Sequence, residues 1–119
     1  MSRATRRGKR EWAPDRGDLV WLDFDPQAGH EQSGRRPAMV VSPRAYNQAT
    51  GLALCCPITS RVKGYPFEVA LPEGLAARGV ILSDQLRSLD WRARKASRLG
   101  RLPEASVDAV LARVRALLA

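Results

Sequence analysis

The hydrophobic pattern divides the chain into short apolar runs separated by glycine, proline and polar residues. Residues 19–24 and 38–42 are rich in aliphatic and aromatic side chains, and both runs predict strands. Val20, Leu22 and Phe24 would share one face of the first strand, because successive side chains of a strand point to opposite faces. The folded part of the chain is therefore expected to begin with two strands of a sheet.

Further strands are expected as far as residue 91. Residues 43–50 predict a short helical turn closed by Gly51, and the apolar run 52–59 predicts a strand. Pro57 lies inside that strand and requires an edge position or a bulge, because proline has no N–H for the ladder. The remaining strands are expected over 67–71, 79–85 and 86–91. Short strands with turn signals every 8–12 residues are typical of a small antiparallel barrel.

The periodicity changes near the C-terminus. Apolar residues there follow the i, i+3, i+4 spacing of an amphipathic helix, with Pro103 suited to the first turn: Val107, Val110, Leu111, Val114, Leu117 and Leu118. Arg113 and Arg115 lie off this stripe, which favours packing against a core over membrane binding. The fold class is predicted to be mainly β with α, a small antiparallel β-barrel with a C-terminal helix.

The charge distribution indicates the kind of partner. The 119 residues fit one domain, and the formal net charge of +8 favours a polyanion, with nucleic acid ahead of an anionic membrane surface. Residues 1–13 predict a flexible basic arm, or alternatively a solubilising tail, and residues 14–119 a single domain. The basic residues of the arm are Arg3, Arg6, Arg7, Lys9 and Arg10. No apolar run approaches the ~20 residues of a membrane span, and no signal peptide is recognisable.

The few potential metal ligands predict neither a metal ion nor a cofactor. Cys55 and Cys56 are the only cysteines, and adjacent strand residues point to opposite faces, so no internal disulfide is expected and the cytoplasm is the predicted location. One histidine and no spaced cysteine set leave a zinc site without ligands. Asp23 and Asp25, with Pro26 following, are more typical of a turn than of a magnesium site.

A polar loop is expected over residues 29–37, where Gly29, Gly34 and Pro37 interrupt regular structure. The other side chains of this loop include groups that donate to a phosphate, transfer a proton or clamp an anion: His30, Glu31, Gln32, Ser33, Arg35 and Arg36. A solvated surface loop is the plainer interpretation of the same composition. Because a buried strand follows directly, we expect this loop to carry the functional site.

Several separated stretches, in the same order from Gly17 to the C-terminus, resemble the MazF/PemK-type toxin ribonucleases of bacterial toxin–antitoxin systems, and in particular the MazF branch. The matching stretches are 17–21, 23–26, 31–32 with 36–38, 63–69, 84–85 and 91–94. The resemblance implies an SH3-like barrel, a homodimer and metal-independent cleavage of single-stranded RNA at short sequences. It also implies inhibition by an acidic segment of a cognate antitoxin.

The resemblance also implies roles for individual residues. The key arginine of the family falls on Arg36 and its key threonine on Thr59, while the glutamate of the MazF branch falls on Glu31. His30 matches a histidine of the PemK branch. That branch also has an arginine two residues before the aspartate that matches Asp84, where this chain has Leu82, so Arg36 and Thr59 are weighted above Asp84.

These residue types suit cleavage by the 2′-OH of the RNA itself. The guanidinium of Arg36 offers a charged, planar fork to phosphate oxygens, and Thr59 can donate its hydroxyl to a non-bridging oxygen. Glu31 or His30 can transfer protons when desolvated, and the choice between them stays open. The other expected RNA-binding residues, each of which could also be an ordinary surface group, are Arg35, Lys63, Asp84, Gln85 and Arg87.

Two non-catalytic functions are the alternatives. Related toxins of this fold poison DNA gyrase and depend on a C-terminal Trp-Gly-Ile, whereas this chain ends Ala116-Leu117-Leu118-Ala119. A barrel that binds nucleic acid without cutting it is the second alternative. Arg36 and Thr59, in the order of the family, favour cleavage.

Overall fold

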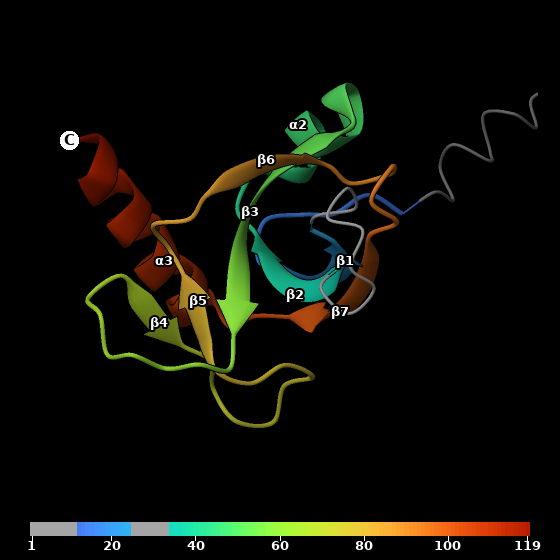
Figure 1. Cartoon of the computed structure of the whole chain (residues 1–119). Coiled ribbons are helices and arrows are strands. Elements are labelled where there is room, and N and C mark those ends of the chain that lie inside the picture. Colours follow the sequence, from blue (N-terminus) through green and yellow to red (C-terminus); the bar gives the residue numbers. More distant parts are fainter. Residues whose placement is uncertain (1–11, 25–33) are drawn as a thin grey trace, which may run out of the picture.

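Seven antiparallel strands form the body of the computed structural model, which describes residues 12–24 and 34–119 (Figure 1). The strands are β1 Asp18–Asp23, β2 Arg35–Val40, β3 Leu52–Thr59, β4 Glu68–Ala70, β5 Val80–Leu82, β6 Arg87–Asp90 and β7 Ser97–Arg101. Their order is β4-β5-β3-β2-β1-β7, and β6 also pairs with β3. The helices are α2 Arg44–Thr50 and α3 Glu104–Leu118. This curved, barrel-like sheet with a C-terminal helix confirms the predicted fold class.

β3 is the strand that holds the sheet together, and it spans the predicted residues. One side of β3 pairs with β2, while the other side pairs first with β6 through Cys55 and then with β5 from Ile58. The carbonyl of Leu54 accepts from the N–H of Val41 on the β2 side, so the backbone of Pro57 faces the other side. Pro57 therefore lies at the gap between β6 and β5, where no N–H is needed.

β2 begins earlier than its sequence indicates. The predicted loop over 29–37 was wrong for its last residues, because β2 starts at Arg35 and Pro37 is paired with Trp21 of β1. The N–H of Phe24 bonds the carbonyl of Gly34 at 2.7 Å, so the alternating ladder turns the nitrogen of Pro37 away from β1. On that side, pairing with β3 begins only at Ala38. Pro37 thus costs the sheet no hydrogen bond.

The later strands also differ from the prediction. β4 is shorter than expected, and so are β5 and β6, which are separated by a turn in which Gln85 N–H bonds the carbonyl of Leu82 at 3.1 Å. β7 was not predicted at all. Its sequence, SRLGR, is mostly exposed and has no apolar alternation, and it forms a strand because β1 offers a free edge. Tertiary pairing determines this element.

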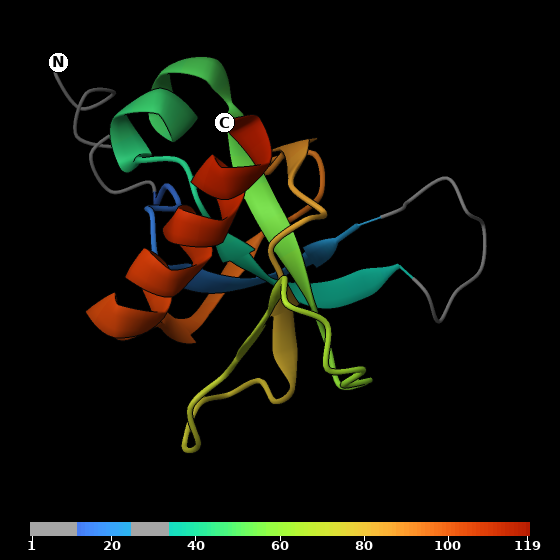
Figure 2. The same ribbon diagram turned by 90° about the vertical axis from the view of Figure 1, so that its left-hand side faces the viewer.

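The sheet separates two hydrophobic cores. We call the first the helix-side core: α3 lies against one face of the sheet (Figure 2) and buries Val110 and Val114 there among residues that include Leu19, Cys56 and Ile81. The second core holds Val20, Leu22, Phe24, Cys55, Leu89 and Trp91. Two predictions are confirmed here: the first strand buries one shared face, and the two cysteines, both free, point to opposite sides.

The ends of the described chain differ in packing. Trp12 and Ala13 pack against the second core, with Trp12 edge-on to Trp91 at 6.0 Å between ring centroids, whereas the basic residues of the predicted arm lie outside the described residues. At the other end, Leu117 and Leu118 of α3 are exposed, so the apolar stripe packs only as far as Val114. Neither described helix is long and apolar enough to span a membrane.

Candidate active site

A groove of about 320 Å³ joins the start of β2, the end of β3, the loop 60–66 and the turn after β5. Five residues predicted for the site line this groove: Arg36, Thr59, Lys63, Asp84 and Gln85. Sequence reasoning gave no role to its other lining residues, which are Arg61, Tyr65, Phe67, Glu68 and Leu82. The groove thus gathers, from segments far apart in the sequence, most of the predicted residues that the structure describes.

Arg36 enters the groove as an unpaired cation. It is exposed on β2, and within the described part of the chain its guanidinium makes no hydrogen bond or ion pair. Its full set of N–H donors is therefore available to an anion. A charged planar fork in this state is suited to bind phosphate oxygens.

Arg35, the preceding residue, has a different role from the one predicted. Its guanidinium lies 3.1 Å from the carboxylate of Asp23 and donates to the carbonyls of Trp21, Arg94 and Lys95. It also stands over the Trp21 ring, at 6.0 Å from the centroid. Because neighbouring strand residues point to opposite faces, the structure separates Arg35 from Arg36 and uses it to join β1 to the turn before β7.

Other predicted residues also lie outside the groove. Arg87 is absent from the groove lining and stacks on the ring of Phe24, with 5.1 Å between its guanidinium carbon and the ring centroid. His30 and Glu31 fall outside the described residues, in the segment between Phe24 and Gly34. Gly34, the first described residue after that segment, lies two residues before Arg36.

The hydroxyl of Thr59 accepts one hydrogen bond from the backbone and can still donate one to a ligand. It is the last residue of β3 and is paired with Val80 of β5. Its Oγ1 accepts the backbone N–H of Arg61 at 3.1 Å. Since a hydroxyl can accept and donate at once, its O–H remains able to reach a ligand in the groove.

The loop 60–66 is fixed by Glu68 and Arg113. The Glu68 carboxylate accepts the backbone N–H groups of Lys63 at 3.1 and 3.2 Å and of Gly64 at 2.8 Å. From α3, Nε of Arg113 donates to the carbonyl of Pro66 at 2.9 Å. These bonds hold the loop while its residue Tyr65 stays 60% exposed. The sequence signal for this arrangement was the carboxylate of Glu68 four residues after a loop glycine.

The two buried thiols of β3 stay protonated. Burial, with a smaller contribution from Asp84, raises the pKa of Cys56 to about 12. Burial likewise raises the pKa of Cys55 to about 12. Both thiols are therefore neutral at physiological pH. Among the described residues, no three His, Cys, Asp or Glu side chains are grouped as ligands for a metal ion.

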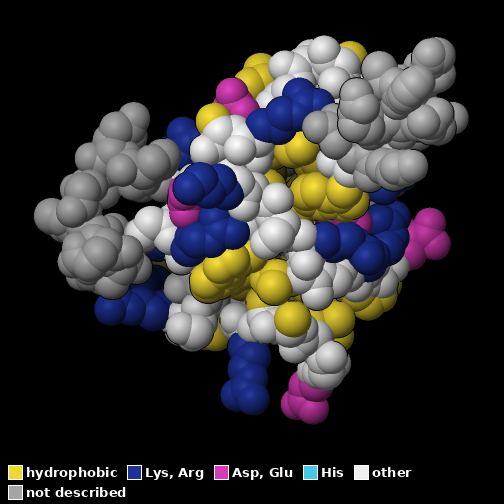
Figure 3. Space-filling model, turned by 90° about the vertical axis from the view of Figure 1, so that its right-hand side faces the viewer, with side chains coloured by type: hydrophobic (Ala, Val, Ile, Leu, Met, Phe, Trp, Pro, Cys, Tyr) yellow, Lys and Arg dark blue, Asp and Glu magenta, His cyan; other side chains and the backbone are white. Residues whose placement is uncertain are grey.

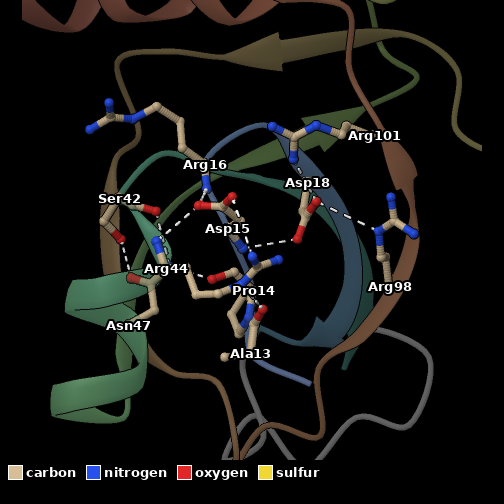
Figure 4. A network of polar contacts seen from close by, with 10 residues as sticks. All are labelled: Ala13, Pro14, Asp15, Arg16, Asp18, Ser42, Arg44, Asn47, Arg98 and Arg101. Atoms are coloured by element: carbon tan, nitrogen blue, oxygen red, sulfur yellow. Dashed lines mark hydrogen bonds and ion pairs between the residues drawn. The ribbon is translucent and has the colours of Figure 1, made fainter. Parts of the chain in front are cut away.

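A second group of cations lies in a polar network near the start of β1 (Figure 4). Asp18, buried with 2% of its side chain exposed, lies 3.0 Å from Arg101 and 3.6 Å from Arg98. Asp15 accepts the backbone N–H groups of Arg16 and Arg44, each at 2.9 Å. We call this the Asp18 network. Its arginines contact carboxylates, unlike those that line the groove.

Surface charge alone does not locate the site. On the face shown in Figure 3, Lys and Arg side chains stand in separate groups around exposed hydrophobic atoms. A shallow hollow of about 270 Å³ elsewhere is mainly apolar, lined by Trp21, Pro37, Leu99 and residues 76–78, and holds none of the predicted site residues. The groove is distinguished by its unpaired cations beside a donor hydroxyl.

Comparison with known proteins finds a matching family model and related proteins that cover most of the chain. The family model described as "PemK-like, MazF-like toxin of type II toxin-antitoxin system" matches residues 15–118. Endoribonuclease toxin MazF of Escherichia coli K12 is 48% identical over 107 residues, which cover 90% of this chain and 96% of that protein. Endoribonuclease PemK of Escherichia coli is 39% identical over 116 residues, with coverage of 92% and 86%.

Solved structures agree with these sequence matches. MazF from Deinococcus radiodurans superposes with a TM-score of 0.83 at 56% identity, covering 91% of this chain and 98% of that one. In a MazE–MazF complex from the same organism, the matching chain gives a TM-score of 0.81 at 50% identity, with coverage of 91% and 97%.

Proposed function

The chain belongs to the PemK-like, MazF-like toxin family of type II toxin–antitoxin systems, and we propose that it is an endoribonuclease that cuts single-stranded RNA without a metal ion. The observation that carries this proposal is the unpaired guanidinium of Arg36 in one groove with the hydroxyl of Thr59. The related MazF and PemK proteins named above are endoribonucleases. The two non-catalytic alternatives have no comparable support.

The groove suits a single-stranded polyanion. Arg36, Arg61 and Lys63 supply positive charge, and the carboxylate of Glu68 is already engaged by loop N–H groups. Tyr65 offers an exposed ring on which an unstacked base can pack. A duplex keeps its bases stacked inside, so this combination of charge and exposed aromatic surface favours a single strand.

The reaction needs three contributions and no redox step. The 2′-oxygen attacks the adjacent phosphorus as its proton is removed, the bond to the 5′-oxygen breaks, and that oxygen gains a proton. The products are a 2′,3′-cyclic phosphate and a 5′-hydroxyl. Arg36 stabilises the charge on the non-bridging oxygens of the phosphorane, and Thr59 donates its O–H to one of them. We assign the proton transfers to Glu31 or His30.

We extend the proposal to protein partners. The Deinococcus relative is solved in complex with MazE, and we infer that an acidic segment of a cognate antitoxin competes with RNA for the basic groove of a homodimer. Light scattering should give the mass of two chains at micromolar concentration. A monomer mass would contradict the dimer, and cleavage unchanged by saturating antitoxin would contradict a shared groove. We place the toxin in the cytoplasm, which its two free thiols suit.

The test is cleavage of a long RNA by the purified protein in excess EDTA, followed by mapping of the new ends. Cyclic phosphate and 5′-hydroxyl ends are expected, and a 2′-deoxy nucleotide at the cut position should block cleavage there. An identically purified Thr59→Ala variant controls for contaminating ribonucleases. Activity that is lost in EDTA and restored by magnesium would contradict the mechanism.

A further inference from the structure

Gly79 lies directly against the backbone of Thr59. A Cβ added at residue 79 would lie 2.0 Å from the carbonyl oxygen of Thr59 and 2.8 Å from Cα of Ser60, and real Cβ atoms essentially never approach another atom within 3.0 Å. The φ of Gly79 is also +111°, a conformation that other residues rarely adopt. Position 79 thus excludes a side chain for two independent reasons.

The two sides of this contact are not equally free to move. β5 begins directly after Gly79 with Val80 and Ile81, which are 3% and 0% exposed. The carbonyl of Gly79 also accepts the N–H of Leu71 at 2.9 Å. Thr59, in contrast, is the last residue of β3, and the exposed Ser60 and Arg61 that follow it precede the bonds that fix the loop from Lys63 onward. A side chain at 79 would therefore displace Thr59 and Ser60 rather than β5.

We propose that Gly79 is a positioning residue of the cleavage site, which allows β5 to approach closely enough to hold the Thr59 hydroxyl in the groove. This inference rests on the proposed function. To relieve the contact, the carbonyl of Thr59 must move by about 1 Å, which is the difference between 2.0 and 3.0 Å. Its Oγ1 moves with the backbone. Misplacement on this scale lowers turnover by up to ~10²-fold.

Gly79→Ala is the main variant, and Gly74→Ala is its matched control. Gly74 belongs to the same connection before β5 and has a φ of +92°, but a Cβ there meets nothing within 4 Å. The control therefore carries the cost of a positive φ without the clash. Gly79→Asn is the second variant, since asparagine tolerates positive φ better than alanine while adding the same Cβ.

For the two position 79 variants, the expected result is a kcat lowered by about 30-fold, with KM within about threefold of wild type, while Gly74→Ala keeps wild-type turnover. Adding Gly79→Ala to Thr59→Ala should cause no further loss, because Gly79 acts through the hydroxyl that is already absent. Circular dichroism and thermal unfolding identify the temperature range in which each variant is folded.

Three results would overturn the inference. The first is equal turnover in Gly79→Ala and Gly74→Ala. The second is a full additional loss when Gly79→Ala is combined with Thr59→Ala, which would mean that Gly79 acts elsewhere. The third is failure of both position 79 variants to fold, since the clash would then not be absorbed at Thr59. If wild type itself does not cleave RNA, the proposed function fails and the inference with it.

Discussion

The groove and the Asp18 network both contain arginines, but the arginines of the two regions differ in their contacts. In the network, Arg98 and Arg101 lie within 4 Å of the buried carboxylate of Asp18. In the groove, the side chains of Arg36 and Lys63 make no ion pair with any described residue. Paired cations stabilise the fold, whereas unpaired cations beside a donor hydroxyl can bind a substrate phosphate. Both regions hold several cations. The two regions differ in whether those cations contact a carboxylate, and this difference distinguishes the structural network from the proposed binding site.

The same contrast occurs between two adjacent residues of β2. Arg35 forms the ion pair with Asp23 and bonds three carbonyls, while Arg36 points to the other face and has no partner among the described residues. Because successive side chains of a strand point to opposite faces, two neighbouring arginines have different surroundings and different roles. Substitutions of a paired residue and of an unpaired residue test whether the two kinds of arginine differ in role.

The largest effect is expected in the groove itself. Arg36→Ala and Thr59→Ala should each lower turnover by about 10²-fold or more, as for other contacts to transition-state charge. Arg36→Lys should fail as well, because a point charge does not replace the two-donor fork. Steady-state kinetics on a defined RNA measures the loss, and thermal unfolding should show that both alanine variants stay folded. Near-normal turnover would remove that residue from the site.

A stability effect of about 2 kcal/mol is expected in the Asp18 network. Asp18→Asn removes the charge that Arg98 and Arg101 face, and the half-exposed arginines recover part of the loss through hydration. Urea unfolding measures the change. The matched control is Asp108→Asn on the exposed side of α3, which should change stability by less than ~0.5 kcal/mol. Loss of turnover in a fully folded Asp18→Asn protein would contradict the structural role.

A smaller effect is expected at Arg35. Arg35→Ala should lower the free energy of unfolding by about 1 kcal/mol, because its pair with Asp23 is only partly buried. Turnover of the folded variant should stay within about twofold of wild type, in direct contrast to Arg36→Ala. A loss of turnover as large as that of Arg36→Ala, with stability unchanged, would show that the two arginines do not differ in role.

The smallest effect concerns pH. Burial acts to raise the pKa of Asp15, but the backbone N–H groups of Arg44 and Arg16 and the charges of Arg44 and Arg101 together lower it below the ordinary 3.8. A carboxyl with a lowered folded-state pKa contributes stability that is present above its unfolded pKa and lost as pH falls through the folded value. Melting temperature should therefore fall less between pH 5 and pH 3 in Asp15→Asn than in wild type. Equal falls would contradict this assignment.

Elements with a strong local pattern could be predicted from the sequence. β3 was predicted over its observed residues because a long apolar run lies between Gly51 and polar residues. β7 could not be predicted, since its polar sequence becomes a strand only through pairing with β1. The early start of β2 was missed for a similar reason, because nothing local shows that Pro37 faces a side without a partner.

The site was predictable only in part. Arg36, Thr59, Lys63, Asp84 and Gln85 do line one groove. The engagement of Arg35 by Asp23, and of Arg87 by Phe24, depends on contacts that sequence order does not reveal. Glu68 was missed because its role is to hold the N–H groups of a loop, which leaves no signature beyond a carboxylate near a glycine.

We propose that the unpaired cations of the groove, and not the paired cations of the Asp18 network, bind the RNA. NMR titration of the wild-type protein at physiological salt tests it most directly, using a single-stranded RNA that carries one 2′-deoxy nucleotide at the mapped cut position. Amide shifts should change around Arg36, Thr59, Lys63 and Asp84 and stay unchanged around Asp18 and Arg101. Changes centred on the Asp18 network, with none in the groove, would contradict it.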